Sequence, residues 1–268
     1  MWAYRGLRNG VLTTGWPARP DGYAARTRGP ATVLAAAPAR AGELAGLCPT
    51  GAITAAGGGQ VRLDQGRCIQ CGHCVTGCPD MFGWAAGPGS AALARSALIV
   101  PPAPETPALL AGIRGELRAR TRALRRSVHL RHVDAGSDGT EEWEILALLN
   151  PVYDVHRLGI FFTASPRHAD VLLVTGTGTG GMAEPLRQTY EAMPHPKVVI
   201  AVGTDAVSGG LAGLPPGGGD GGGGDGGGVG RLVPVDVWLP GSPPSPFSIL
   251  HALLLALGRL PGTAGAQG

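Results

Sequence analysis

Apolar residues in the second half of the chain follow two alternating spacings. Residues 171–174 and 198–202 are unbroken runs of Val, Leu, Ile and Ala, which are typical of strands buried on both faces of a parallel sheet. Stretches with helical spacing lie between and after such runs. The expected strands and helices are, in chain order, residues 128–133, 142–149, 171–175, 183–193, 198–203, 232–235 and 246–257. This alternation predicts an α/β domain with a parallel sheet over residues 113–260.

The first half of the chain divides by composition more than by periodicity. Residues 1–30 have neither helical nor strand spacing and predict an extended arm. Residues 31–84 form a small region that ends in a group of cysteines, and residues 85–112 have the Ala, Gly and Pro content of a linker. The glycine tract at 215–230 predicts a surface loop, and because it leads into a strand and not into a helix, it does not favour phosphate binding. We therefore expect two domains joined by a linker.

Charge and hydropathy exclude several classes of function. The 268 residues carry a formal net charge of +3, too weak a bias to indicate a nucleic-acid surface. No basic segment followed by an apolar run opens the sequence, so we expect no secretory signal and a reducing compartment. The apolar run at 247–257 is interrupted by Ser248 and His251 and is too short to span a bilayer. Any membrane association is therefore expected to come through a partner.

The cysteines carry the strongest chemical signal. Cys68, Cys71 and Cys74 are each separated by two residues, and Cys78 follows directly before a proline. This is the spacing with which bacterial ferredoxins hold a 4Fe-4S cube. Four cysteines can also bind tetrahedral zinc, which is the competing interpretation. We expect one 4Fe-4S cluster, because five cysteines in a reducing compartment favour ligation over disulfides.

The fourth cluster ligand is open between two cysteines. In two-cluster ferredoxins the cysteine before proline binds the other cluster, which directs Cys78 away from its own triplet. A second Cys-Pro pair begins at Cys48, ahead of an expected hairpin across residues 53–64, so Cys48 is the favoured ligand and Cys78 the alternative. Counting back from Cys48 by the same spacing gives Leu44, Ala41 and Pro38, none of which binds iron. One cluster is therefore expected to be lost and one kept.

The second half resembles a known family. The segments 150–160 and 165–176, followed by 182–187, 190–194 and 199–203, are similar to the small subunit shared by energy-converting nickel-iron hydrogenases, formate hydrogenlyase and respiratory complex I, the NADH-quinone oxidoreductase. Residues 5–10 and 16–17, together with the cysteine region, resemble the ferredoxin subunit of the same complexes. The resemblance implies an α+β ferredoxin-like domain followed by an α/β flavodoxin-like domain, fused in one chain.

The chain departs from this family where the family binds its own cluster. The resemblance places the four ligand cysteines at positions where this chain has Asp138, Glu141, Asp205 and Ser242. Carboxylates and a hydroxyl are hard donors poorly suited to an iron-sulfur cube, so this second cluster is expected to be absent. Magnesium or calcium is an alternative occupant, and carboxylates that simply face solvent or arginine are another.

Two functions remain open at this stage. The first is an electron-transfer subunit of a membrane-associated complex, whose large subunit and membrane subunits the resemblance implies as partners. It would lie in the cytoplasm, peripheral on the inner face of the cell membrane through those partners. The second is a scaffold or assembly subunit that has given up redox work. A weaker third hypothesis makes Cys78 a redox-sensing thiol.

Overall fold

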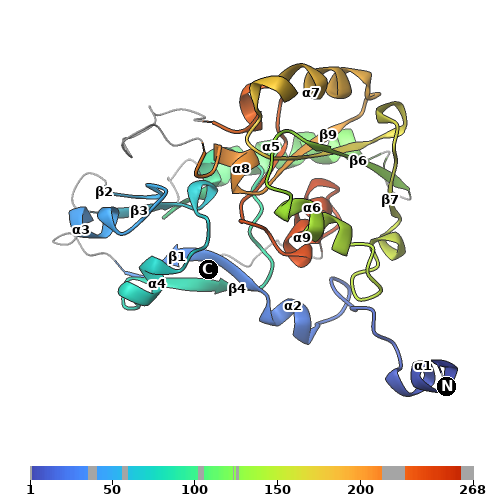
Figure 1. Cartoon of the computed structure of the whole chain (residues 1–268), viewed down its shortest axis with the longest axis horizontal. Coiled ribbons are helices and arrows are strands. Elements are labelled where there is room, and N and C mark those ends of the chain that lie inside the picture. The colour runs from blue at the N-terminus through green and yellow to red at the C-terminus, as the bar shows by residue number, and fades with distance from the viewer. Residues whose placement is uncertain are drawn as a thin grey trace.

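A computed structural model of the chain describes residues 2–35, 41–55, 60–101, 106–122, 124, 127–212 and 227–260. Its second half is built on a five-stranded sheet in the order β10-β9-β8-β6-β7, and every neighbouring pair in it is parallel. The strands are β6 (Val128–Asp134), β7 (Ile160–Phe162), β8 (Val171–Thr175), β9 (Val198–Val202) and β10 (Val237–Leu239). The predicted α/β half with a parallel sheet is confirmed (Figure 1).

Helices cover both faces of this sheet, which explains its unbroken apolar strands. Every residue of β8 and β9 is buried. On one face Leu130 and Leu173 pack with α5 (Thr106–Thr121), α6 (Thr140–Ala147) and α9 (Pro246–Ala256). On the other, Leu172 and Val199 pack with α7 (Gly180–Ala192) and α8 (Thr204–Ser208). Since burying one such side chain contributes roughly 1.5–3 kcal/mol, the two layers supply most of the stability of this half.

The first half contains two small antiparallel sheets. One pairs β1 (Arg28–Val33) with β4 (Phe82–Ala86), and the other has the order β2-β3-β5, with β2 (Ile53–Ala55), β3 (Val61–Asp64) and β5 (Ile99–Val100). Their common core includes Leu44 from α3 (Ala41–Gly46), Leu63 and Phe82. The predicted hairpin over 53–64 is confirmed by the β2–β3 pairing. The short helix α4 (His73–Gly77) carries part of the cysteine motif.

The structure differs from the sequence predictions in four places. The first thirty residues contain helices α1 (Trp2–Asn9) and α2 (Gly22–Arg26) and the start of β1, where we expected an extended arm. Within residues 85–112, β5 pairs with β3, so this stretch contributes a strand. Strand β7 was missed, and the strand expected at 232–235 begins later, as β10, after a 3-10 turn over Val229–Arg231. Residues 213–226, most of the glycine tract, lie outside the described residues.

Two of the connections between the halves use backbone groups near the ends of the parallel strands. Ala92 and Trp238 exchange both backbone hydrogen bonds, of 2.9 and 2.8 Å, so the stretch after β4 pairs with strand β10. The hydroxyl of Thr204, at the start of α8, donates to the carbonyl oxygen of Cys68 at 2.9 Å. The cysteine region therefore lies against the end of the parallel sheet. Among the described residues, none of the helices is both long and apolar enough to cross a membrane.

Candidate functional site

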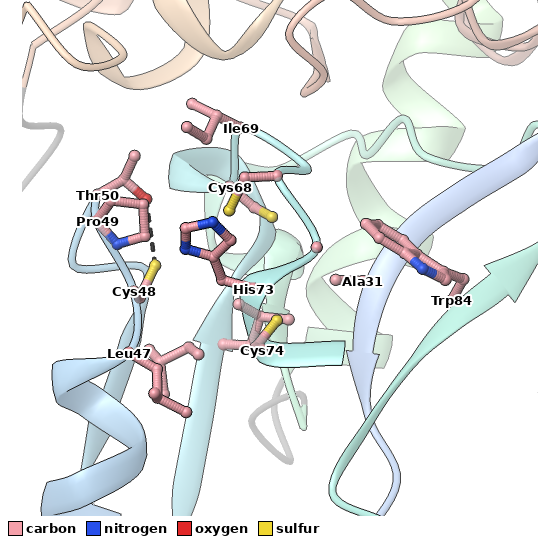
Figure 2. A pocket seen from close by; sticks show the side chains of 14 residues that line it. Ala31, Leu47, Cys48, Pro49, Thr50, Cys68, Ile69, His73, Cys74 and Trp84 are labelled. Atoms are coloured by element: carbon pink, nitrogen blue, oxygen red, sulfur yellow. Dashed lines mark hydrogen bonds between the residues drawn. The ribbon is translucent and has the colours of Figure 1, made fainter. Parts of the chain in front are cut away.

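Four of the five cysteines line one pocket. Cys48 follows α3, Cys68 follows the 3-10 turn η3 (Gln65–Arg67), Cys71 lies in the next loop, and Cys74 is on α4. Figure 2 shows Cys48 on one side of the pocket and Cys68 and Cys74 on the other. Cys78 is not among the lining residues. The structure thus brings together the four cysteines of the favoured ligand set.

The backbone conformation of residues 64–74 explains how one short loop presents three thiols. The carboxylate of Asp64 accepts a 2.9 Å bond from the amide of Gly66 and caps η3, which ends at Cys68. Gln70 has a φ of 56°, unusual for a non-glycine residue. Gly72 has a φ of 80° and precedes α4. These two left-handed residues flank Cys71 and reverse the chain, so that Cys68 and Cys74 line the same pocket.

Backbone amides already point at two of the sulfurs. The amide of Ala52 donates to Sγ of Cys48 at 3.3 Å, and the amide of Gln70 donates to Sγ of Cys68 at 3.4 Å. The hydroxyl of Thr50 lies 3.4 Å from Sγ of Cys48. Hydrogen bonds to cluster sulfurs stabilise negative charge and tune the reduction potential. The pocket therefore provides donors suited to thiolate ligands.

The thiols are close enough to influence each other's protonation. Burial raises the pKa of Cys68 to about 12, and negative charge on Cys48, Cys74 and Cys71 contributes to the same shift. Burial likewise raises the pKa of Cys74, with the same contribution from Cys48 and Cys71. Four thiolates so close together repel one another. A bound metal supplies the positive charge that keeps its thiol ligands deprotonated.

Four thiols around one pocket have the chemistry of an iron-sulfur ligand set. Within the described part of the chain, no three His, Cys, Asp or Glu side chains are placed to hold one metal ion. Zinc requires four donors about 2–2.3 Å from one point, and the zinc interpretation remains the competing hypothesis. In a cube each thiolate binds a different iron, so its ligands surround a larger object and need not converge on one point. The residues present fit that group.

Two of the positions that we expected not to bind iron, Cys78 and Leu44, are buried in the core. Cys78 is 3% exposed and packs in the core of the first half with Phe82. Leu44, one of the positions of the missing second triplet, is completely buried in the same core. Of the other two positions, Pro38 lies outside the described residues. An apolar side chain thus occupies a place where the second triplet would have had a thiol.

Sequence reasoning missed two side chains that line this pocket and a third that packs on one of them. His73 and Trp84 are among its lining residues, and Figure 2 shows the ring of His73 directed into it. The guanidinium of Arg28 lies 4.8 Å from the centroid of the Trp84 ring, an arrangement of the cation–π kind. The position of His73 inside the cysteine motif was the available signal for it, whereas Trp84 comes from the pairing of β4 with β1, which the motif alone does not reveal.

Only some of the four positions with oxygen side chains lie close together. These positions are Asp138, Glu141, Asp205 and Ser242. They follow strands β6, β9 and β10, whose carboxyl ends share one edge because the sheet is parallel. Burial raises the pKa of Glu141 to about 7, and the charges of Asp205 and Asp138 contribute to the same shift. Burial and the charge of Asp138 also raise the pKa of Asp205. Ser242 is exposed, and the neighbouring Gly241 donates to the hydroxyl of Thr204 and accepts from its amide.

Short-range bonds account for the different behaviour of these carboxylates. Asp138 is exposed and accepts bonds of 3.0 and 2.7 Å from the amide and hydroxyl of Thr140, which lower its pKa. Glu141 is 1% exposed and accepts one 3.2 Å bond from the same hydroxyl. A magnesium or calcium site gains no support here, because no three acidic side chains of the described residues are placed around one ion.

A second polar group lies beside these acids, at the ends of β6 and β8. Glu142 accepts bonds from Ser137, at 2.9 Å, and from the hydroxyl of Thr175. Nε2 of His132 lies 3.0 Å from the Thr175 hydroxyl and 3.4 Å from Glu142. Burial lowers the pKa of His132, while the charge of Glu142 opposes that shift. The carboxyl edge of the sheet is thus lined by oxygen and nitrogen donors where the resemblance places a cluster.

Comparison with known proteins assigns the domain that contains this edge to a family. Residues 139–256 match the family model of the NADH ubiquinone oxidoreductase 20 Kd subunit. The probable membrane-bound hydrogenase subunit mbhJ of Pyrococcus furiosus is 42% identical over 135 residues, which cover 50% of this chain and 77% of that protein. The chain belongs to this family. Glu141, Asp205 and Ser242 lie inside the matched residues, whereas all five cysteines lie outside them.

Two further relatives extend the comparison. Formate hydrogenlyase subunit 7 of Escherichia coli is 37% identical over 145 residues, so the match spans about half of each protein, 54% in both cases. In the solved membrane-bound sulfane sulfur reductase, described as an archaeal respiratory membrane complex, one chain is 27% identical, with a TM-score of 0.41, over 54% of this chain and 76% of that one. The cysteine half lies outside the part that this protein shares with its family.

Proposed function

We propose that this protein is an iron-sulfur electron-transfer subunit of a membrane-associated complex of the hydrogenase or NADH-quinone oxidoreductase kind. One observation carries the proposal. Cys48, Cys68, Cys71 and Cys74, from two stretches twenty residues apart, line a single pocket, and Cys78 does not. The proposed cofactor is one 4Fe-4S cluster held by these four thiolates.

The relatives support the proposed setting. Their names describe subunits of a membrane-bound hydrogenase and of formate hydrogenlyase. We propose a hydrogenase-like or complex-I-like large subunit and membrane subunits as partners, and a location on the inner face of the cell membrane held through those partners. The proposed division of the chain is a cluster-binding region at 31–84, a connection at 85–112 and the family domain at 113–260.

The residues of the pocket have defined tasks in such a subunit. The four thiols bind the cluster, which when bound accepts and releases single electrons. The amides of Ala52 and Gln70 donate to the sulfurs of Cys48 and Cys68 and favour the more negative, reduced state. Leu63 and Trp84, which also line the pocket, limit the access of water. Cys71 is exposed and marks the side on which a redox partner can approach.

Iron analysis and electron paramagnetic resonance test the proposal. Anaerobically purified protein should contain about four irons per chain and give a signal after reduction with dithionite. About eight irons would show that the Asp138, Glu141, Asp205 and Ser242 positions still support a cluster. Iron near zero in a correctly folded protein, after attempted reconstitution with iron and sulfide, would overturn the proposal.

A scaffold or assembly subunit is the second candidate. The observation in its favour is the set of oxygen side chains at the positions where the resemblance places cluster ligands, with Glu141 buried among them. Without a cluster at this edge, electrons leaving the cysteine pocket have no next centre among the described residues of this chain. The same iron analysis separates the two candidates, since a scaffold folds and binds its partners without iron.

A further inference from the structure

One hydrogen bond joins the cysteine pocket to the family domain. The hydroxyl of Thr204 donates to the carbonyl oxygen of Cys68 at 2.9 Å and accepts from the amide of Gly241 at 3.1 Å. The amide of Thr204 donates to the carbonyl oxygen of Gly241 at 2.7 Å. Thr204 is completely buried. This one residue therefore joins three segments that are far apart in sequence.

Thr204 lies in one of the loops to which the resemblance assigns the family's own cluster. Thr204 and Asp205 begin α8, directly after β9, and Gly241 and Ser242 follow β10. These are two of the loops in which the resemblance places ligands of the family's own cluster. Here α8 packs against η3, the turn that leads into Cys68. The loops after β9 and β10, where the resemblance places a cluster of the family, thus support the loop that carries Cys68.

We propose that Thr204 is a positioning residue for the cluster, and that it holds the backbone of Cys68 in the orientation the cube requires. This inference rests on the proposed function, because it assumes that Cys68 is a ligand. The physical argument concerns the backbone. The bond to the Cys68 carbonyl is partly buried, and such a carbonyl resists rotation because rotation would leave it without this partner.

Fixing the Cys68 carbonyl has two consequences for the cluster. The next peptide units lead to Gln70, whose amide donates to Sγ of Cys68 at 3.4 Å. If the carbonyl turned, this amide would move, and the hydrogen bond that stabilises charge on the sulfur would weaken. Loss of the Thr204 hydroxyl should therefore shift the reduction potential in the negative direction and loosen the cluster, without removing any ligand.

The test compares Thr204→Ser with Thr204→Ala in the full chain loaded with iron. Both variants remove the methyl group, so they leave a similar space and differ in the hydroxyl alone. We expect Thr204→Ser to match the unaltered protein, and Thr204→Ala to lose iron to a chelator about fivefold faster, as expected for one lost hydrogen bond. The midpoint potential and the paramagnetic spectrum of Thr204→Ala should also change, which a merely structural role would not cause.

Ser208→Ala is the matched control. Ser208 lies on the same short helix, is buried, and its hydroxyl donates to the carbonyl oxygen of Thr204 at 3.0 Å, within α8 and not toward the cysteine loop. We expect normal iron retention and an unchanged potential. Equal effects of Ser208→Ala and Thr204→Ala would overturn the inference, because they would reflect damage to α8.

The outcomes separate this inference from the proposed function. Iron near zero in the unaltered protein defeats both. Iron near four in the unaltered protein, with Thr204→Ala and Thr204→Ser alike in iron loss, potential and spectrum, defeats the role of Thr204 alone. If Thr204→Ala fails to fold, Thr204→Val is compared with Thr204→Ser. Thr204→Val fills the space of the threonine without its hydroxyl, so normal retention and potential in Thr204→Val would equally overturn the inference.

Discussion

Arg95 and Asp64 face each other through two parallel hydrogen bonds, Nη1 to Oδ1 and Nη2 to Oδ2, each 2.7 Å long. Their side chains are 19% and 20% exposed, so this ion pair is largely shielded from solvent. Asp64 also caps the turn that leads into Cys68. The pair therefore links the stretch after β4 to the base of the cysteine loop.

Removing this ion pair should destabilise the first half. We expect Arg95→Ala to lower the free energy of unfolding by about 1–3 kcal/mol, because Asp64 keeps its partly buried charge without the opposite charge of the guanidinium. Chemical denaturation at constant ionic strength measures this change. Arg187→Ala is the control, since Arg187 lies 4.0 Å from Glu184 on an exposed helix face and its loss should change stability by less than about 0.5 kcal/mol. Equal effects of the two substitutions would contradict the argument.

The two candidate fourth ligands can be separated by substitution. Cys48→Ser should abolish the cluster signal, and Cys71→Ser should do the same, because a hydroxyl is a poor substitute for a thiolate on iron. Cys78→Ser should keep the signal. It should lower stability by about 1–3 kcal/mol, because it places a hydroxyl at a buried position. Iron content and paramagnetic resonance are the measurements, and loss of the cluster in Cys78→Ser with retention in Cys48→Ser would reverse the assignment.

Glu141 should make stability depend on pH. Its pKa of about 7 in the folded protein is raised from the ordinary value of 4.5, so between these values the folded form binds more protons than the unfolded form. The free energy of unfolding should therefore fall as the pH rises from 4.5 to 7, by up to about 3 kcal/mol, and this loss should be complete above pH 7. Asp205, whose pKa is also raised, adds to the same trend.

Glu141→Gln tests this dependence. The amide carries no charge at any pH, so the stability of this variant should change much less between about pH 5 and pH 8. Denaturation curves at these two pH values measure the difference, with Glu184→Gln, an exposed carboxylate on α7, as the control. A pH profile for Glu141→Gln as steep as that of the unaltered protein would show that Glu141 is not the group responsible.

Gly203 should not tolerate a side chain. Its φ is 95°, and a Cβ at this position would lie 2.6 Å from Oε1 of Glu141. We expect Gly203→Ala to lower the free energy of unfolding by more than about 1 kcal/mol, from backbone strain and from the clash together. Adding Glu141→Ala should recover the part due to the clash, which a double-mutant cycle measures. Gly180→Ala, where nothing lies within 4 Å of the added Cβ, is the control.

The sequence was most informative where a single rule dominates. Strands β8 and β9 are apolar throughout because both faces are covered, so they could be predicted. Strand β7 has only three residues and follows the left-handed Gly159, which leaves no period to recognise. Helix α1 was missed because eight residues that include two arginines and a glycine are too few for a clear helical pattern.

The sequence predicted which four cysteines lie together, but not the surroundings of the pocket that they line. Cys48 was found because the crossover rule links a cysteine before proline to a distant triplet. Thr204 could not be found in this way, since its contact with Cys68 joins residues 136 positions apart and depends on how the two halves pack. The gathering of Asp138, Glu141 and Asp205 was anticipated through the resemblance, whereas the exposure of Ser242 follows from the local turn after Gly241.

The backbone pairing of Ala92 with Trp238 has a consequence for the proposed electron transfer. This pairing and the Thr204 contact tie the cysteine pocket to the sheet at two separate points. A pocket anchored in this way does not swing between a donor and an acceptor. In the proposed electron-transfer role, the tunnelling distance would then be set when the subunits assemble, and the rate of transfer would depend on where neighbouring chains hold their own centres.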